Sequence, residues 1–393
     1  MQQMALSLPP VPTRAAGLAR LEAFVPKAGL AYAARRNEDL PGHPHVSGLS
    51  PWIRHRLVTE AEVIDAAQAR HGEAAAKFVA EVWWRTYWKG WLEMRPAVWT
   101  EYANGLTAAL NRVQTEAGLR AGWEAACKGE TGIDAFDHWA RELVATNWMH
   151  NHARMWFASI WIFTLRLPWE LGADFFLRHL MDGDPASNTL SWRWVGGLHT
   201  AGKTYLATPD NIAKNTGGRF RPTGLARVAE PLGNPRHPAP RPAPQGQDWA
   251  RGTPSLLLLH EDDLDASWLL EQGLAPLGTA ALTATAGRSP LAVSEGVHAF
   301  VAGAVADALA RHGGGPVFDR DALGALADHA ASLGAAQVVA PYAPVGPTAS
   351  ALRKLVPLLQ ERGITLVQPL RDHDRHAWPH ATHGFFRFRE AVM

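Results

Sequence analysis

The chain has 393 residues, of which 47% are hydrophobic and 19% charged, and its formal net charge at pH 7 is +1. That length allows two or three domains, the composition excludes a largely disordered protein, and no apolar run reaches the roughly 18 residues of a membrane span. A single cysteine, Cys127, excludes an intrachain disulfide, and without a secretory signal at the N-terminus we expect a cytoplasmic protein that does not bind a membrane.

Residues 1 to about 220 have the pattern of a helical domain. Good helix formers recur there with an apolar face at helical spacing, and Pro168 separates the last two such segments. The pattern predicts helices over 72–94, 133–145, 152–167 and 169–181. Tryptophan is concentrated in this half, where 14 of the 17 indoles lie. That concentration indicates packing around a large planar ligand or electron transfer, with a tryptophan-rich core as the alternative.

The composition changes after residue 220. Eight prolines between Pro222 and Pro254 predict an extended, semi-rigid linker over 221–253 that is not a packed element. Beyond it, apolar runs alternate with helical patterns. Strands are expected over 255–261, 279–285, 335–342 and 364–370, and helices over 298–312 and 348–363. This alternation predicts a parallel-sheet α/β domain over 254–393, following an all-helical domain over 1–220.

The segment 147–155, "NWMHNHARM", crowds polar groups at the start of an apolar helix. Asn151 directly precedes that helix, so its side chain is either an N-cap or part of a ligand site. The segment 182–194, "DGDPASNTLSWRW", adds Asp182 and Asp184, with which Arg154 could pair. Together the two segments favour a polar site inside the helical half.

Six ordered blocks resemble one known family, the DNA photolyase and cryptochrome flavoproteins. The blocks are "VSGLSP" (46–51), "EVWWRTYW" (81–88), "GETG" (129–132) after Trp123, "NWMHNHARM" (147–155), "PWELGADFF" (168–176) and "DGDPASNTLSWRW" (182–194). The resemblance covers roughly residues 15–220. It implies a helical domain that folds around FAD.

The resemblance implies a set of FAD-binding residues. Hydroxyls and backbone N–H groups near the flavin diphosphate come from one segment, and an arginine–aspartate pair spans the flavin ring. The residues so implied are Tyr32, Ser47, Leu49, Ser50, Arg85, Asn151, Arg154, Asp182, Asp184 and Asn188. Asn188 would face flavin N5, where a neutral amide leaves that atom unprotonated.

The same resemblance implies residues for catalysis and for the DNA lesion. Glu81, Trp84 and Arg85 share one helix face and would border the cavity that receives a pyrimidine dimer. The catalytic set implied is Glu81, Asn151, Met155, Asn188, Trp192 and Trp169, the last two as members of an electron-transfer chain. The substrate set implied is Trp84, Arg85, Met155, Trp194, Lys203 and Arg219. Lys203 and Arg219 belong to a basic stretch, 202–222, that is either a phosphate-contacting loop or a solvated surface loop.

The chain departs from the family pattern at several points. His152 stands where a second arginine is frequent, and Val113 falls at the third tryptophan position, so that electron transfer from the surface either uses another indole such as Trp99 or is inefficient. The α/β domain follows the helical one instead of preceding it, which indicates a circular permutation. Its first strand, within 256–270, has acids where the family has arginines, and 375–392 resembles the segment that leads into the helical part.

These observations predict a flavoprotein that carries FAD and repairs cyclobutane pyrimidine dimers in DNA by light-driven electron transfer, acting as a monomer. Asn188 favours repair over a cryptochrome-like photoreceptor, which is one alternative. A flavin-binding interaction module is another. The lesion type, cyclobutane or (6-4), and any antenna pigment are left open. Four histidines within 372–383 resemble a metal site, but Pro379 breaks the helix and no set of tetrahedral ligands is complete, so no metal is expected.

Overall fold

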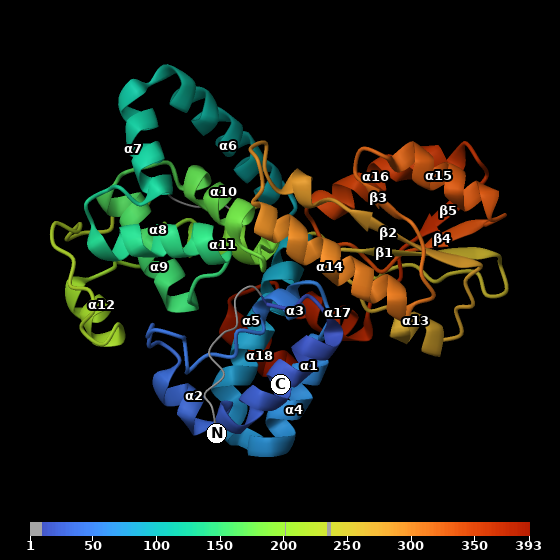
Figure 1. Ribbon diagram of the computed structural model, residues 1–393, viewed down its shortest axis with the longest axis horizontal. Coiled ribbons are helices and arrows are strands. Elements are labelled where there is room, and N and C mark those ends of the chain that lie inside the picture. The colour runs from blue at the N-terminus through green and yellow to red at the C-terminus, as the bar shows by residue number, and fades with distance from the viewer. Residues whose placement is uncertain (1–9, 201, 234–236) are drawn as a thin grey trace.

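The computed structural model describes residues 10–200, 202–233 and 237–393. Residues 1–9, part of the N-terminus in which no secretory signal is expected, and residues 234–236 of the predicted linker lie outside these ranges. Within them, no helix is both long and apolar enough to cross a membrane. The described chain forms a helical half and an α/β half that lie against each other (Figure 1).

The helical half contains all four predicted helices. In chain order its helices are α1 (Arg14–Phe24), α2 (Leu30–Arg35), α3 (Ser50–Arg54), α4 (Glu60–His71), α5 (Ala76–Glu93), α6 (Ala97–Thr115), α7 (Ala117–Lys128), α8 (Asp134–Thr146), α9 (Asn151–Ser159), α10 (Trp169–His179), α11 (Pro185–Val195) and α12 (Pro209–Asn215). Short turns η1 (Val25–Lys27) and η2 (Gly72–Ala75) precede α2 and α5. The helix predicted over 152–167 ends in a π-helical turn, η3 (Ile160–Thr164).

The α/β half is a five-stranded parallel sheet with helices on both faces. Its elements are β1 (Ser255–His260), α13 (Ser267–Glu271), β2 (Gly278–Thr283), η4 (Thr285–Arg288), α14 (Glu295–Arg311), β3 (Val317–Asp319), α15 (Leu323–Ser332), β4 (Gln337–Val339), α16 (Pro347–Gln360), β5 (Thr365–Val367), α17 (Asp372–Ala377), η5 (Trp378–His380) and α18 (Phe385–Val392). The strand order is β3-β2-β1-β4-β5, and every pairing is parallel. The expected fold class, a helical domain followed by a parallel-sheet α/β domain, is confirmed.

The central strand explains this arrangement. β1 reads "SLLLLH" and is buried along its whole length, as a strand covered on both faces must be. Leu256 and Leu258 face the core under α15 and α16, whereas Leu257 and Leu259 face the core shared with α14. The strand missed in the sequence, β3, has three residues and an exposed pattern, so it carried no buried run to detect.

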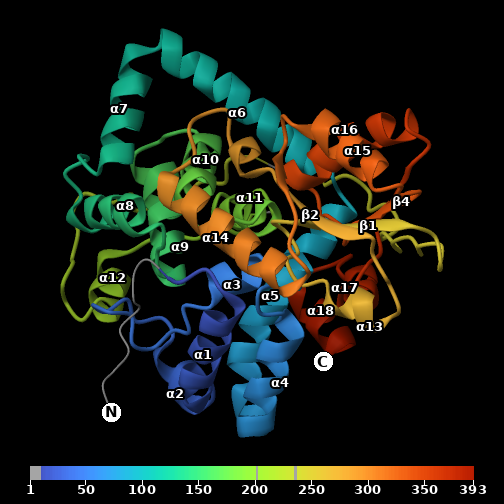
Figure 2. The same cartoon turned by 45° about the vertical axis from the view of Figure 1, so that its right-hand side comes forward.

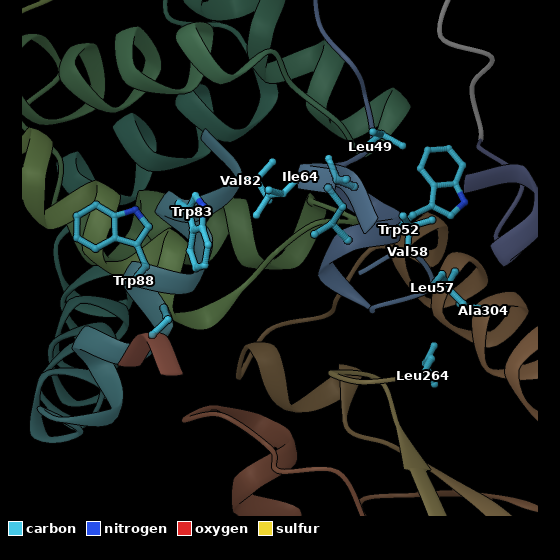
Figure 3. Packing of buried hydrophobic residues seen from close by; sticks show 14 of the residues in the cluster. Leu49, Trp52, Leu57, Val58, Ile64, Val82, Trp83, Trp88, Leu264 and Ala304 are labelled. Carbon is cyan, nitrogen blue, oxygen red and sulfur yellow. The ribbon is translucent and has the colours of Figure 1, made fainter. Parts of the chain in front are cut away.

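The two halves share one hydrophobic core. Figure 3 shows Trp52, Leu57 and Val58 of the helical half beside Ala304 of α14, with Leu264 of the loop after β1 nearby. The Trp52 ring contacts Phe300 of α14 edge-on at 6.2 Å between centroids. α14 also contacts α1 and α10, and it spans from the sheet to the helical half in Figures 1 and 2. The two halves are therefore joined by a packed interface.

The described linker residues have no helix or strand and most of them are exposed, but several of them contact both halves of the molecule. Trp249 is buried. The Arg241 backbone N–H donates to the Met94 carbonyl at 2.9 Å, and the Ala250 N–H donates to the Gln337 side chain at 3.1 Å. Proline has no N–H to donate, but the residues between the prolines do, and those groups bond to both halves of the molecule.

The C-terminal segment returns to the helical half. α17, η5 and α18 all pack on α5, and Figure 2 shows α18 beside α5. The Trp83 ring of α5 stacks on His373 at 4.6 Å and 13° between planes. The Thr86 hydroxyl lies 3.1 Å from His373 Nε2. The last elements of the chain thus complete the surroundings of a helix near its beginning.

Candidate functional site

Side chains from α3, α5, α9, α11 and the turn before α11 meet in what we call the central polar cluster. Its members are Ser50, Arg85, Arg154, Asp182, Asp184 and Asn188. Ser50 and Arg154 hydrogen-bond to Asp182, the Arg85 charge acts on Asp182 and Asp184, and the Asn188 N–H bonds to the Asp184 carbonyl one turn earlier in α11. Each of the six residues was implied by the resemblance, and their roles toward FAD stay predictions.

The Arg154–Asp182 ion pair expected from the sequence is present. Arg154 Nη2 donates to both Asp182 carboxylate oxygens, at 2.9 and 3.1 Å, and its Nε donates to the Met149 carbonyl at 3.0 Å. The Asp182 side chain is 4% exposed and that of Arg154 is 22% exposed. Burial acts to raise the pKa of Asp182, but the Arg154 charge and hydrogen bonds from Arg154 and Ser50 lower it overall. Asp182 is thus a buried anion, and its partner Arg154 remains partly exposed.

The N-cap reading of Asn151 is wrong by one residue. His150 is the N-cap of α9, because its backbone is extended and its Nδ1 accepts a hydrogen bond from the His152 N–H at 3.1 Å. Asn151 is the first helical residue, and its side chain is exposed. The ring nitrogen of a histidine can replace the usual Ser, Thr, Asp or Asn acceptor, so the amide of Asn151 is not needed as a cap. The ligand role of Asn151 stays a prediction.

Asp184 begins α11 and lies next to two cations that the sequence analysis missed. Its carboxylate caps the helix by accepting from the Ser187 N–H at 2.7 Å. Burial acts to raise the pKa of Asp184, but the Lys89 and Arg54 charges lower it overall. Lys89 is almost fully buried in α5, and its Nζ lies 3.9 Å from Glu60. Lys89 directly follows the block 81–88 and Arg54 lies three residues after the block 46–51, which was the available signal.

Asn188 and Trp192 lie one turn apart on α11. Asn188 Nδ2 donates to the Ala173 carbonyl at 2.8 Å, which fixes the amide. The buried Trp192 ring lies over Gly172 of α10, where an added Cβ would come within 2.3 Å of the indole. Gly172 follows Trp169 by three residues on the same face of α10, and both indoles belong to the same hydrophobic core.

A run of aromatic rings continues from Trp169 toward α6. The Trp169 ring lies 5.7 Å from Tyr102, and Tyr102 lies 5.1 Å from Trp99, measured between centroids. Val113, at the nominal third tryptophan position, is a buried residue further along α6. Trp99, named from the sequence as a possible replacement, is therefore in reach of Trp169 through one tyrosine.

The α5 residues lie where one face of the helix meets the cluster. Glu81 Oε1 is 3.5 Å from Arg36, and the Glu81 side chain is 37% exposed. Desolvation nevertheless raises the pKa of Glu81. The charge of Arg85 contributes to the lowered pKa of both Asp182 and Asp184, which places Arg85 on the cluster side of α5. Trp84 is half-buried and lies at the edge of that face.

The residues expected at the diphosphate lie on the approach to α3. Leu49 is the fully buried N-cap of α3, and its N–H donates to Ser47 Oγ at 3.3 Å. The Ser47 carbonyl accepts from Arg20 Nε at 2.6 Å. Tyr32 is buried against Phe24 and Phe78, and burial together with the Glu81 charge raises its pKa. Tyr32 therefore packs near Glu81 as a neutral phenol.

The expected substrate residues differ in their surroundings. Trp194 stacks on Tyr205 with 5.8 Å between centroids, and the Tyr205 hydroxyl lies 3.2 Å from His152 Nε2. Met155 is half-buried on α9 and Lys203 is exposed. Arg219, in contrast, donates to the Asp39 carbonyl at 2.6 Å. A guanidinium held by an aspartate does not support the expected phosphate contact of Arg219, and that of Lys203 stays a prediction.

The histidines of 372–383 do not gather into a metal-binding group. His373 is stacked on Trp83, and the His376 and His380 rings meet edge-on with 5.9 Å between their centroids. Over the described ranges, no three metal-ligating side chains are placed to share an ion.

Comparisons with known proteins find similarity in the helical half. Residues 78–220 match the family model described as the FAD binding domain of DNA photolyase. The deoxyribodipyrimidine photo-lyase of Streptomyces griseus is 36% identical over 165 residues, which cover 42% of this chain and 34% of that protein. The enzyme of the same name from Thermus thermophilus is 34% identical over 221 residues, covering 55% of this chain and 49% of that protein.

A solved structure is similar over a comparable stretch. The bacterial class III photolyase from Agrobacterium tumefaciens is 26% identical, with a TM-score of 0.43, over 52% of this chain and 43% of that chain. The chain thus spans about a third to a half of the length of the curated relatives described here.

Proposed function

This chain belongs, through its helical half, to the DNA photolyase and cryptochrome family, and from that premise we propose that it binds FAD and splits cyclobutane pyrimidine dimers in DNA under light. The observation that carries the proposal is the central polar cluster. Arg154 of α9 pairs with Asp182 of the turn before α11, and Arg85 of α5, the helix that bears Glu81 and Trp84, acts by its charge on Asp182 and Asp184.

The residues of the cluster fit a flavin. A flavin presents N–H and carbonyl groups along its polar edge and a diphosphate at the other end, and the cluster offers carboxylates, a guanidinium, an amide and hydroxyls. The Ser187 hydroxyl is buried without a hydrogen-bond partner among the described residues, as expected where a polar ligand belongs. Ser47 and Ser50 would hold the diphosphate, and Arg154 with Asp182 would orient the ring. When bound and reduced, FAD supplies the electron that light sends to the dimer and that the split products return.

The expected lesion residues fit a flipped-out dinucleotide. Photolyases are among the enzymes that take their target bases out of the duplex stack. Trp84 and Trp194 offer indole faces on which pyrimidines stack, and Met155 adds an apolar contact. Glu81, with its raised pKa, retains a proton more readily than an ordinary glutamate and could donate a hydrogen bond to a base carbonyl.

The test is dimer repair by the flavin-loaded, reduced protein. An oligonucleotide with one thymine dimer is illuminated with the protein, and recovery of intact thymines is followed. A dark sample and the Glu81→Gln variant are the controls, and we expect slower repair by the variant. Flavin that binds and photoreduces without any repair would favour the photoreceptor alternative. Protein that takes up no FAD on reconstitution would refute the proposal.

We propose further that the α/β half, taken here as 254–393, is the family's α/β domain in permuted order, joined through the linker 221–253 to the helical domain 1–220. The packing of α18 on α5 and the shared core support this. A rearranged chain in which 254–393 precedes the helical half should fold with the same far-UV spectrum and bind FAD. Failure of that chain to fold would argue against a simple permutation.

A further inference from the structure

The Trp84 ring is covered on one face by an aromatic residue from the end of the chain. Phe385, the first residue of α18, stacks on Trp84 with 3.8 Å between ring centroids and 10° between the planes. Phe385 is buried, whereas Trp84 is half-buried. Trp84 further contacts Trp88 and Tyr87, both on its own helix. Phe385 is therefore a ring contact that reaches Trp84 from outside α5.

Phe385 is itself held in place by contacts between α5 and the C-terminal segment. The Tyr87 hydroxyl donates to the His383 carbonyl at 2.7 Å, and Arg95 Nη2 donates to the Thr382 carbonyl at 2.9 Å. Gly90 has no side chain, and a Cβ there would lie 2.7 Å from the Trp378 ring. The segment thus approaches α5 closely and is fixed just before α18 begins.

The adjacent Phe386 gives a natural contrast. It is 69% exposed, and Arg389 lies over its ring with 5.7 Å from the guanidinium carbon to the centroid. Phe385 and Phe386 have the same side chain on the same helix turn. Because only Phe385 stacks on Trp84, the pair separates the effect of that contact from the effect of losing a phenylalanine on α18.

We infer that Phe385 is a positioning residue for Trp84 in dimer recognition. The C-terminal helix α18 supports one face of the Trp84 indole, and the lesion stacks on the other. This inference rests on the proposed function. An unsupported indole can turn about its side-chain torsions, and fixing it on binding costs conformational entropy. With Phe385 stacked against it, Trp84 is held in one orientation before the dimer binds. Dimer binding therefore does not have to reduce the conformational entropy of the Trp84 side chain.

The experiment measures binding in the dark with flavin-loaded protein. The probes are an oligonucleotide with one thymine dimer and the same oligonucleotide undamaged. For Phe385→Leu we expect the Kd for the dimer to rise about 3- to 10-fold, the size of one aromatic stacking contact. The Kd for undamaged DNA, the FAD occupancy and the repair rate at saturating substrate should stay within about twofold. Phe386→Leu should leave all four quantities unchanged.

Two further variants keep the interpretation specific. Phe385→Tyr retains the ring and should restore dimer binding. In the Trp84→Ala background, Phe385→Leu should add no further loss, because a residue that acts through Trp84 has nothing left to position. A purely structural role would instead lower the melting temperature and FAD occupancy in both backgrounds.

The possible outcomes are separable. If the parent protein prefers the dimer and Phe385→Leu retains that preference in full, the inference is overturned and the proposed function stands. Additive losses in the double variant would also overturn it. If the parent protein with bound FAD shows no preference for the dimer, the proposed function fails, and this inference fails with it.

Discussion

Two groups of charged residues in this protein have the same chemistry but different surroundings. In the central polar cluster, Arg154 has one carboxylate partner and remains 22% exposed. At the interface of the two halves, the buried Arg56 meets Glu60 at 3.3 Å, Asp263 at 3.1 Å and Asp374 at 2.5 Å. Charges that the protein neutralises with several of its own acids stabilise the fold, whereas an arginine with an open side has capacity left for a ligand.

The interface charges also account for a departure seen in the sequence. The first strand of the α/β half is followed by acids where the family it resembles has arginines. Here Asp262 pairs with Arg54 at 2.5 Å, and Asp263 pairs with Arg371 at 2.6 Å as well as with Arg56. In this chain the acids after β1 are therefore paired with arginines at the interface.

The largest effect is expected from Arg56→Met, which tests whether the charges at the interface of the two halves stabilise the fold. The substitution leaves three buried carboxylates without their shared cation, and breaking a buried ion pair in this way costs about 3–5 kcal/mol. The free energy of unfolding, from denaturant titration, should fall by that amount. A loss below about 1 kcal/mol would show that the interface charges are solvated and that the contrast with Arg154 is false.

The second effect concerns His43, which lies between the protein's own acids Asp39 and Glu142 at 3.3 Å from each. Burial acts to lower the pKa of His43, but its bonds to both carboxylates raise it to about 9. A raised pKa means stability that is present in full below the unfolded-state value of about 6.5 and is lost as the pH rises through 9. We expect a loss of about 2–3 kcal/mol over that window.

His43→Gln is the matched variant for that pH dependence. It keeps hydrogen-bonding capacity without the titrating ring, so the unfolding free energy between pH 6.5 and 9 should become nearly flat. The neighbouring His150 has a pKa lowered to about 4, chiefly by burial, and does not titrate in the window. An unchanged slope in the variant would assign the pH dependence to another group.

Arg154→Ala tests whether the central polar cluster serves a ligand. It should lower the free energy of unfolding less than Arg56→Met does. Asp182 keeps the hydrogen bond from Ser50, and the exposed side of the pair admits water, so we expect about 1–3 kcal/mol. FAD retention during gel filtration should fall more steeply than stability. If FAD occupancy is unchanged while stability drops as far as in Arg56→Met, the two groups of charges are not functionally different.

Trp192→Phe sharpens the comparison without disturbing charge. Phenylalanine fills most of the space over Gly172 but is far harder to oxidise, so FAD should remain bound while photoreduction of the oxidised protein slows at least about tenfold, or about 1.4 kcal/mol in barrier. Repair by chemically reduced protein should survive. Trp99→Phe is the comparison variant and should give a smaller effect. Photoreduction at the parent rate in Trp192→Phe would remove this indole from the pathway.

Local patterns predicted much of the fold, and long-range pairings were beyond them. Periodicity located six of the longer helices, α5, α8, α9, α10, α14 and α16, and four of the five strands in the described residues, because each depends on neighbours in the sequence. The Arg154–Asp182 pair was expected from two motifs in known order. The pairing of Arg54 with Asp262, the capture of Arg219 by Asp39 and the stacking of Phe385 on Trp84 each join residues over 100 positions apart, and a single sequence carries no local signal for such contacts.

The attachment of the C-terminal segment to α5 has a consequence for biosynthesis. Thr86 and His373 are separated by 287 residues, so at a synthesis rate of about 5–20 residues per second the ribosome needs roughly 15–60 s to make the partners of α5. During that interval the Trp83 and Tyr87 face of the helix is without its cover. We expect nascent chains stalled before residue 370 to bind a chaperone that recognises apolar segments, and full-length released chains to lose that binding. The C-terminal segment therefore covers α5 only when synthesis of the chain is nearly complete.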